Sequence, residues 1–325
     1  MRQQHSSRSR LQSGLRKRAA YLAILTAVGL AITAGAHEAQ QGTPAPITDM
    51  VEVAENLYML ANADPAAGDA WTGGNIGVWV TETGVVLVDT KLPGYGQAIL
   101  DQVRSVTDKP VTTIINTHTH FDHSGSNTEF PETVTIVTHE GTAAQMARDD
   151  CQPVTNCEAF QGDNARFLPD LTYSERMSLF SGRDQIDLYH FGRGHTNGDT
   201  LIVFPAVRVM HTGDLFPWRR LPFVDADSSG GSAVDYGETL NKAVAGIPDV
   251  DRIITGHIDN PVAWAEFEAF AGFYNHLAGV ARAGMEAGQS VDEAAAGYAV
   301  PDEYGEYSAE PDTVRSIMQL IYDGR

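Results

Sequence analysis

The residues with the clearest capacity for chemistry lie in the segment 117–125, which reads Thr-His-Thr-His-Phe-Asp-His-Ser-Gly. His118 and His120 are two positions apart after a predicted strand, so their side chains project to the same side of an extended backbone. Asp122 and His123 follow where the chain begins to turn. One loop therefore offers two groups of ligands for neighbouring metals. Imidazole and carboxylate ligands suit zinc, with iron or manganese as alternatives.

Three more candidate ligands occur later in the chain, each directly after a glycine: His195, Asp214 and His257. Loops that follow strands let a rigid sheet fix the ligand geometry while one coordination position stays open for water. A surface metal scavenger or an accidental histidine cluster would not require such distant partners. We therefore expect these side chains to converge on one metal centre.

This ordered set resembles the ligand pattern of the metallo-β-lactamase-fold hydrolase superfamily, which includes lactamases, glyoxalase II thioesterases and acyl-homoserine lactonases. The motif His-x-His-x-Asp-His is matched at 118–123, and the resemblance covers roughly 51–270. It implies an α/β fold, a four-layer αββα sandwich with the site along the sheet edges, and two zinc ions per chain. By position, one metal would be held by His118, His120 and His195, the other by Asp122, His123 and His257, with Asp214 as the bridge.

The mechanism that the resemblance implies is attack by a metal-bound hydroxide. Two zinc ions roughly 3.5–4 Å apart hold a water and lower its pKa from ~15.7 towards ~7. The hydroxide attacks an acyl carbon, and Asp122 is the candidate catalytic residue that accepts or steers a proton. Asp89 would, by the same resemblance, orient a ligand histidine, and a helix N-cap or turn role is the alternative. For His211, His139 and His190 we expect packing or support of the ligands.

Asp214 distinguishes between branches of the superfamily. Zinc β-lactamases typically have Cys or Ser at the matching position, whereas thioesterases and lactonases have Asp. The sequence therefore favours hydrolysis of a small acyl substrate, namely a lactone, ester, lactam or thioester, with a metallo-β-lactamase proper as one alternative. The alternative of another class is a persulfide dioxygenase, which binds one iron through two His and an Asp. The complete second ligand set favours two metals.

The segment 215–223 directly follows Asp214 and combines aromatic residues with Arg219 and Arg220. It could form the walls of a substrate site, with a guanidinium that pairs with a substrate carboxylate. The alternative is that both arginines face solvent or pair with some of the chain's many acids. The segment 229–232, Ser-Gly-Gly-Ser, precedes a predicted helix and is typical of a turn and cap.

Charge limits the classes of partner. The chain of 325 residues has a formal net charge of −20, with 22 basic and 42 acidic residues. Six of the basic residues and none of the acidic ones lie in residues 1–36, so the rest of the chain carries −26. Affinity for nucleic acids and for anionic membranes depends on Lys and Arg. We expect a small-molecule substrate and no nucleic-acid partner.

Residues 1–36 have the pattern of a secretory signal peptide. A basic run at 16–18 precedes an apolar stretch at 19–34, and Ala34-Gly35-Ala36 is a typical cleavage site. The apolar stretch is marginal for a transmembrane anchor. We expect cleavage before His37, a periplasmic or secreted protein of residues 37–325, and no membrane anchor afterwards. In that compartment Cys151 and Cys157 could form a disulfide across a short loop, with two free thiols as the alternative.

The remaining sequence predicts alternating strands and helices. Strands are expected at 50–61, 75–81, 84–89, 111–115, 133–138, 185–191, 200–204, 208–211 and 252–255. Helices are expected at 96–106, 142–148 and 234–245, with C-terminal helices within 263–322. An aromatic stripe at 267–277 is typical of core packing. Apart from its helical piece, 140–183 is irregular and predicts loops in a lid-like insertion. Two clusters of strands with outer helices indicate a layered sandwich of similar halves.

Overall fold

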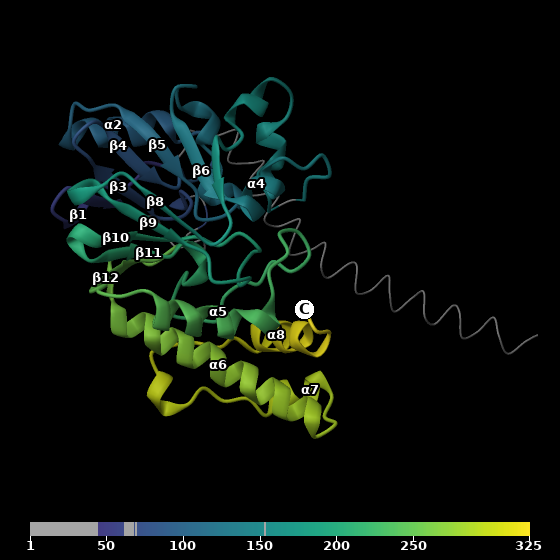
Figure 1. Cartoon of the computed structure of the whole chain (residues 1–325). Coiled ribbons are helices and arrows are strands. Elements are labelled where there is room, and N and C mark those ends of the chain that lie inside the picture. The colour runs from purple at the N-terminus through teal and green to yellow at the C-terminus, as the bar shows by residue number, and fades with distance from the viewer. Residues whose placement is uncertain (1–44, 62–67, 69, 153) are drawn as a thin grey trace, which may run out of the picture. The chain divides into compact units, whose positions relative to one another are not determined.

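Two β-sheets form the centre of the segment Pro46–Arg325 in the computed structural model (Figure 1). The structure describes residues 45–61, 68, 70–152 and 154–325. The predicted signal peptide at 1–36 lies outside the described residues. In the described part of the chain, every helix is too short or too polar to cross a bilayer.

The first sheet has seven strands, and their order in space is their order in the chain. They are β1 (Val51–Ala54), β2 (Leu57–Leu60), β3 (Ile76–Val80), β4 (Val85–Val88), β5 (Val111–Ile115), β6 (Thr135–His139) and β7 (Leu171–Tyr173). β1 to β4 form an antiparallel meander, and β4 to β7 run parallel. The parallel strands therefore end on the same edge of the sheet.

The second sheet has six strands in the order β13-β12-β11-β10-β9-β8. They are β8 (Arg176–Leu179), β9 (Ile186–Tyr189), β10 (Leu201–Phe204), β11 (Val209–His211), β12 (Arg252–Ile254) and β13 (Val262–Ala263). All neighbouring pairs are antiparallel except β11 and β12.

The two sheets pack face to face through alternate residues of their strands. In β4, Val86 and Val88 belong to the core between the sheets, whereas Val85 and Leu87 pack on the outer side. In β10, Ile202 and Phe204 likewise face the first sheet. Because successive strand residues point to opposite faces, fully apolar strands can bury both sides at once.

Helices cover the outer face of each sheet. The principal ones are α2 (Gly96–Val106), α4 (Glu140–Met146), α5 (Ala233–Gly246), α6 (Trp264–Glu286) and α8 (Pro311–Tyr322). Shorter ones are α3 (Phe121–Ser124) and α7 (Val291–Ala296). Ile99 of α2 packs on the first sheet, and the aromatic stripe of α6 is buried against the second. The predicted αββα sandwich is confirmed, as is the core role of the stripe.

The segment 140–183 differs from its prediction. Its helical piece is present as α4, but the expected loops include the strands β7 and β8. Both strands are short and lie at one end of their sheets, and most of their positions are exposed or half-buried. They therefore lack the apolar run of a central strand, and only their pairing with β6 and β9 identifies them.

Candidate metal centre

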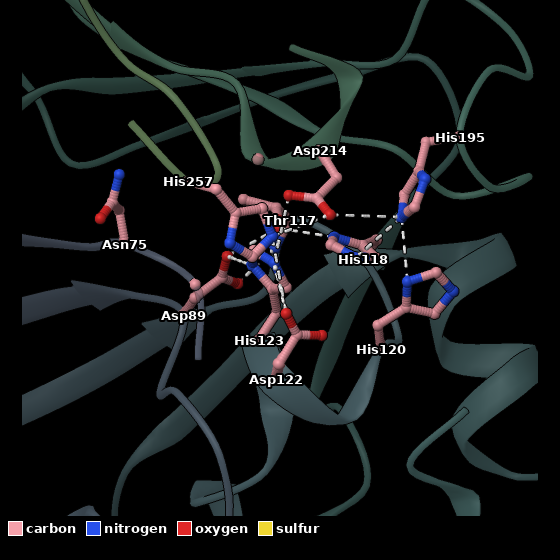
Figure 2. Close-up of polar contacts among 12 residues, drawn as sticks. Asn75, Asp89, Thr117, His118, His120, Asp122, His123, His195, Asp214 and His257 are labelled. Atoms are coloured by element: carbon pink, nitrogen blue, oxygen red, sulfur yellow. Dashed lines mark hydrogen bonds and ion pairs between the residues drawn. The ribbon is translucent and has the colours of Figure 1, made fainter. Parts of the chain in front are cut away.

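The seven predicted ligands meet where loops leave both sheets (Figure 2). The segment with His118, His120, Asp122 and His123 follows β5 and includes α3. The other three ligands, His195, Asp214 and His257, lie in the loops after β9, β11 and β12. All seven side chains are buried. The fold therefore brings together residues that are as much as 139 positions apart.

His118, His120 and His195 form the first group of converging ligand atoms. Nε2 of His195 lies 2.9 Å from Nδ1 of His120 and 3.2 Å from Nε2 of His118. The opposite ring nitrogens contact outer partners: Thr117 Oγ1 at 2.9 Å for His118, Asp225 Oδ2 at 3.0 Å for His120 and the Phe223 carbonyl at 2.8 Å for His195.

These outer contacts determine which nitrogens carry protons. The Asp225 carboxylate and the Phe223 carbonyl only accept, so His120 and His195 must donate to them. Thr117 donates its hydroxyl hydrogen to Asp89, which leaves its oxygen to accept from His118. In neutral rings the three inner nitrogens then point lone pairs at one another. A bound cation satisfies this arrangement, so the residues fit a metal.

Asp122, His123 and His257 form the second group, with ligand atoms within 4.8 Å of one another. Oδ2 of Asp122 lies 3.5 Å from Nε2 of His123 and 3.6 Å from Nε2 of His257. Nδ1 of His123 donates to Asp89 at 2.7 Å, whereas its Nε2 is buried without a hydrogen-bond partner. A buried polar atom left unpaired costs free energy, so this nitrogen also fits a metal.

Asp214 lies between the two groups, as the bridging assignment requires. Its Oδ2 is 3.2 Å from Nε2 of His257 and 3.6 Å from Nε2 of His195, and its Oδ1 is 3.2 Å from Nε2 of His123. Oδ1 has no hydrogen-bond partner. Gly256 is required beside it, because a Cβ at that position would collide with this oxygen. One carboxylate thus contacts members of both groups.

The electrostatics of the centre follow from burial and from the proximity of its charges. Burial, reinforced by neighbouring histidines, lowers the pKa of His118 and of His195. Burial alone would lower the pKa of His123, but Asp214, Asp122 and Asp89 raise it well above its ordinary value. Without a metal, the carboxylates thus favour a proton on His123. A metal would replace this proton as the positive charge.

Asp89 supports the ligand segment and caps no helix. It directly follows β4 in the left-handed region, with φ of 67°, and accepts from the backbone N–H of Thr117 at 2.8 Å. Its other oxygen accepts from the Thr117 hydroxyl and from His123. Of the two roles left open by the sequence, the structure therefore supports the orientation of a ligand histidine.

The sequence analysis missed Asp225 and Asn75. Asp225 accepts from His120, and Ser229 donates to the same carboxylate oxygen at 2.6 Å. Burial alone would raise the pKa of Asp225, but the hydrogen bond and charge of His120 lower it to about 2. Asn75 donates to the carbonyls of Thr255 and Ile258, on either side of His257. Neither residue belongs to a local motif, so only their long-range contacts identify them.

The remaining histidines have structural contacts. His211 donates to the Asn75 carbonyl and accepts from the N–H of Gly213, which positions the loop of Asp214. His139 and His190 stack with ring centroids 3.8 Å apart at the edge of the sandwich. His139 also caps α4. The predicted packing and supporting roles agree with these contacts.

The segment after Asp214 lies along one side of the centre. The ring of Trp218 is 5.1 Å from that of His257, and Phe223 lies about as near to His120 and His195, at 6.3 and 6.0 Å. Phe223 is 52% exposed. Arg219 pairs with Glu266 of α6, and Arg220 stacks over Trp218 at 3.9 Å. Arg219 therefore pairs with an acid of the chain, which was the alternative to pairing with a substrate carboxylate. Ser232 caps α5, as predicted.

The fold and the two ligand groups define a protein of the metallo-β-lactamase type with a candidate metal centre. Residues 69–257 match the family model described as the metallo-beta-lactamase superfamily, and the chain belongs to this family. It is 31% identical to a 2,4-dinitroanisole O-demethylase subunit alpha from Nocardioides sp. over 160 residues, 46% of this chain and 45% of that protein. It is 23% identical to a metallo-beta-lactamase type 2 from Elizabethkingia meningoseptica over 225 residues, 67% and 82% of the two chains.

Solved structures share the fold at lower identity. A sec-alkylsulfatase from Pseudomonas sp. matches with a TM-score of 0.64 and 18% identity, over 85% of this chain and 51% of that one. A metallo-beta-lactamase from Pontibacter korlensis matches with a TM-score of 0.57 and 17% identity, over 70% and 99%. The chain thus spans about half the length of the demethylase subunit and of the sulfatase. The predicted family and fold are confirmed.

Proposed function

We propose that this protein uses two zinc ions to hydrolyse a small acyl substrate: a lactone, ester, lactam or thioester. The observation that carries the proposal is the placement of Asp214, whose carboxylate contacts His195 of the first group and His123 and His257 of the second. A carboxylate shared between two complete ligand groups suits a dinuclear centre.

The same arrangement weighs against a mononuclear iron persulfide dioxygenase. Such a centre needs two histidines and one carboxylate, so one histidine of the first group and the whole second group, Asp122, His123 and His257, would be surplus. Instead, their ligand atoms converge, and Nε2 of His123 is buried without a hydrogen-bond partner. A mononuclear site gives the second group no role, yet its three ligand atoms lie within 4.8 Å of one another.

The protein's own residues would prepare the reaction. When bound, the zinc pair would supply a water of lowered pKa and a Lewis acid for the substrate oxygen. Asp89 and Asp225 orient His123 and His120, and with the zinc pair bound they would leave the inner nitrogens of both rings to the metals. Asp122 and Asp214 each keep 7% of their surface exposed and His257 keeps 8%, so solvent reaches the centre on this side. Asp122 is placed there to accept a proton.

Phe223 and Trp218 support a substrate with an apolar group beside the reacting carbonyl. Each ring lies next to a different ligand group, and Phe223 is the more exposed of the two. Apolar walls with a few polar groups are typical of small-molecule sites. The relatives named above are a demethylase, a β-lactamase and a sulfatase, so family membership leaves the substrate open. A lactamase proper is the second candidate, since the E. meningoseptica relative carries that name.

Export is part of the proposal. The basic, apolar and small-residue pattern of residues 1–36 supports a cleaved signal. The Cys151–Cys157 disulfide, the pairing that the sequence left open, supports an oxidising compartment such as the periplasm. The net charge of −20 supports a small-molecule substrate over nucleic acid.

A hydrolysis panel tests the substrate class. The zinc-loaded protein would be given a chromogenic cephalosporin, acyl-homoserine lactones, a thioester and aryl esters, with metal content measured in parallel. We expect close to two zinc equivalents and turnover of at least one acyl substrate. A single iron together with persulfide-dependent oxygen uptake would refute the proposal. Turnover of the cephalosporin alone would favour the lactamase.

A further inference from the structure

The loop closed by the Cys151–Cys157 disulfide lies along the ligand segment. We call it the disulfide loop; its residue 153 is not described. The N–H of Phe121 donates to the Val154 carbonyl at 3.2 Å, and the N–H of Asn156 donates to the Thr119 carbonyl at 3.2 Å. Between these two hydrogen bonds, Thr155 forms an antiparallel bridge with His120. The loop thus pairs with the backbone of a predicted metal ligand.

Side chains extend this contact. The buried Asn156 amide donates to the Ser124 carbonyl at 2.9 Å. The Ser124 hydroxyl in turn contacts the carbonyls of Thr119 and His120, each at 3.1 Å. Within the loop, the Thr155 hydroxyl accepts from the Gln152 N–H and contacts the Gln152 carbonyl. The disulfide therefore closes a small ring that is already internally hydrogen-bonded.

A second route reaches His120 from the same part of the chain. Arg148, three residues before Cys151, donates to the Ser228 carbonyl at 2.9 Å. The Ser228 N–H donates to Oδ1 of Asp225 at 2.9 Å, and the other oxygen of Asp225 accepts from Nε2 of His120. His120 is therefore held through its backbone by the disulfide loop and through its ring by the Asp225 turn.

The other ligands of the first group rely less on this loop. The outer partner of His118 is Thr117, which is held by Asp89 of the first sheet, and the outer partner of His195 is the Phe223 carbonyl. His123 of the second group is held directly by Asp89. A disturbance of the disulfide loop should therefore reach His120 before it reaches His123.

We propose that the Cys151–Cys157 disulfide is a positioning element that keeps His120 in register with His118 and His195. Breaking it weakens metal binding at this group while the sandwich remains folded. A closed seven-residue ring restricts the loop to conformations that can pair with 119–124. The proposal rests on the proposed function, because it takes His120 to be a metal ligand.

The test compares zinc release from full-length proteins into a chromogenic chelator. The double variant Cys151→Ser/Cys157→Ser removes both sulfurs and leaves no thiol to bind zinc. We expect one of two zinc equivalents to leave about 10-fold faster than from the wild type, with the other unchanged and the far-UV circular dichroism preserved. Gln161→Ala is the matched control, because its amide contacts Cys151 Sγ but belongs to neither route to His120.

Unfolding measurements separate positioning from general stabilisation. A purely structural disulfide would lower the stability of the zinc-bound and chelator-treated proteins equally. Weaker zinc binding instead reduces the difference between them, by about 1.4 kcal/mol for each tenfold loss of affinity at a fixed zinc concentration. An unchanged difference would overturn the proposal.

Asn156→Ala provides a test that keeps the disulfide. It removes the hydrogen bond to Ser124, and we expect a smaller acceleration of the same zinc equivalent, about 3-fold. If both this variant and the double variant released zinc at the wild-type rate, the positioning role of the disulfide would be refuted, and the proposed function would be unaffected. If His118→Ala also bound two zinc equivalents and released them at the wild-type rate, the assignment of the metal ligands would be refuted as well.

Discussion

The two ligand groups of the centre are held in different ways. His123 of the second group donates to Asp89, which directly follows a central strand and is fully buried. His120 and His195 of the first group depend on the segment 223–229, and His120 also on the disulfide loop. His123 is thus fixed from the sheet, as His118 is through Thr117, whereas His120 and His195 are held by loops on the outside of the site.

This difference indicates where specificity and stability reside. Elements in the sheet core are the last to open, whereas loops tolerate substitution and adjust more readily. The loops that hold the first group also carry Phe223, the exposed ring beside His120 and His195. Changes that move the backbone of 223–229 should therefore alter substrate preference and metal binding in the first group together, and should affect the second group less.

Removing the link between the groups should have the largest effect. In Asp214→Ala, His123 and His257 lose their shared carboxylate, so we expect at least a 100-fold loss of kcat and the loss of about one zinc equivalent. Zinc analysis and kinetics with the best substrate of the panel would measure both. Asp235→Ala, which breaks only an exposed pair with Arg193, should remain like the wild type. Unchanged turnover and zinc content in Asp214→Ala would refute the bridge.

A matched pair of substitutions separates the groups. Asp225→Asn neutralises the outer partner of His120 alone, whereas Asp89→Asn neutralises the partner of His123 and the acceptor of the Thr117 hydroxyl that contacts His118. We expect about a 10-fold loss of zinc affinity in each variant. Competition with a chelator should show that Asp225→Asn weakens only the first zinc equivalent and that Asp89→Asn weakens the second as well. A loss of the second equivalent in Asp225→Asn would contradict the proposed division of ligands.

Removing the exposed ring should produce a smaller and selective effect. In Phe223→Ala we expect KM for apolar acyl substrates to rise about 3- to 10-fold with kcat nearly unchanged, because binding and not chemistry is affected. The His195 partner is the backbone carbonyl, which the substitution retains. Phe180→Ala, at another exposed aromatic, is the control. Equal losses for apolar and polar substrates would argue against a wall that binds apolar groups.

The smallest effect should be on acid stability, away from the centre. Burial, with a contribution from His190, lowers the pKa of His139 to about 4. The unfolded histidine titrates near 6.5, so the unfolded state binds more protons between these values, and stability falls as the pH drops from about 6.5 to 4. His139→Asn keeps a capping side chain and should flatten this fall. Urea unfolding of chelator-treated protein would measure it.

A neighbouring variant serves as the control for this pH dependence. Tyr173 packs against His139, and its hydroxyl contacts Thr200. Burial raises the pKa of this phenol, so it does not titrate in acid. Tyr173→Phe should therefore lower the free energy of unfolding at every pH and leave its slope unchanged. If the free energy of unfolding of His139→Asn changed with pH as steeply as that of the wild type, His139 would be excluded as the cause of the pH dependence.

Much of the fold could be predicted because its elements have strong local patterns. The runs that became β4 and β10 are apolar throughout and bounded by turn residues, β5 is rich in β-branched residues, and the aromatic stripe of α6 indicated the core. β7 and β8 could not be predicted, since their strand character comes from pairing with β6 and β9. Edge strands of three and four residues have too few buried positions to show a period.

The sequence by itself determined the family and the set of candidate ligands. Four of the ligands lie within six residues of the chain: His118, His120, Asp122 and His123. The other three each follow a glycine and occur in a recognisable order, so they too can be found in the sequence. Only the tertiary structure decided which side chains support them. Asp225 and His120 are 105 residues apart, and neither position marks the other. A metal ligand must be a histidine or a carboxylate, so its residue type can be recognised in the sequence. The outer partner of a ligand histidine can be any hydrogen-bond acceptor, and only folding places that acceptor beside the ring.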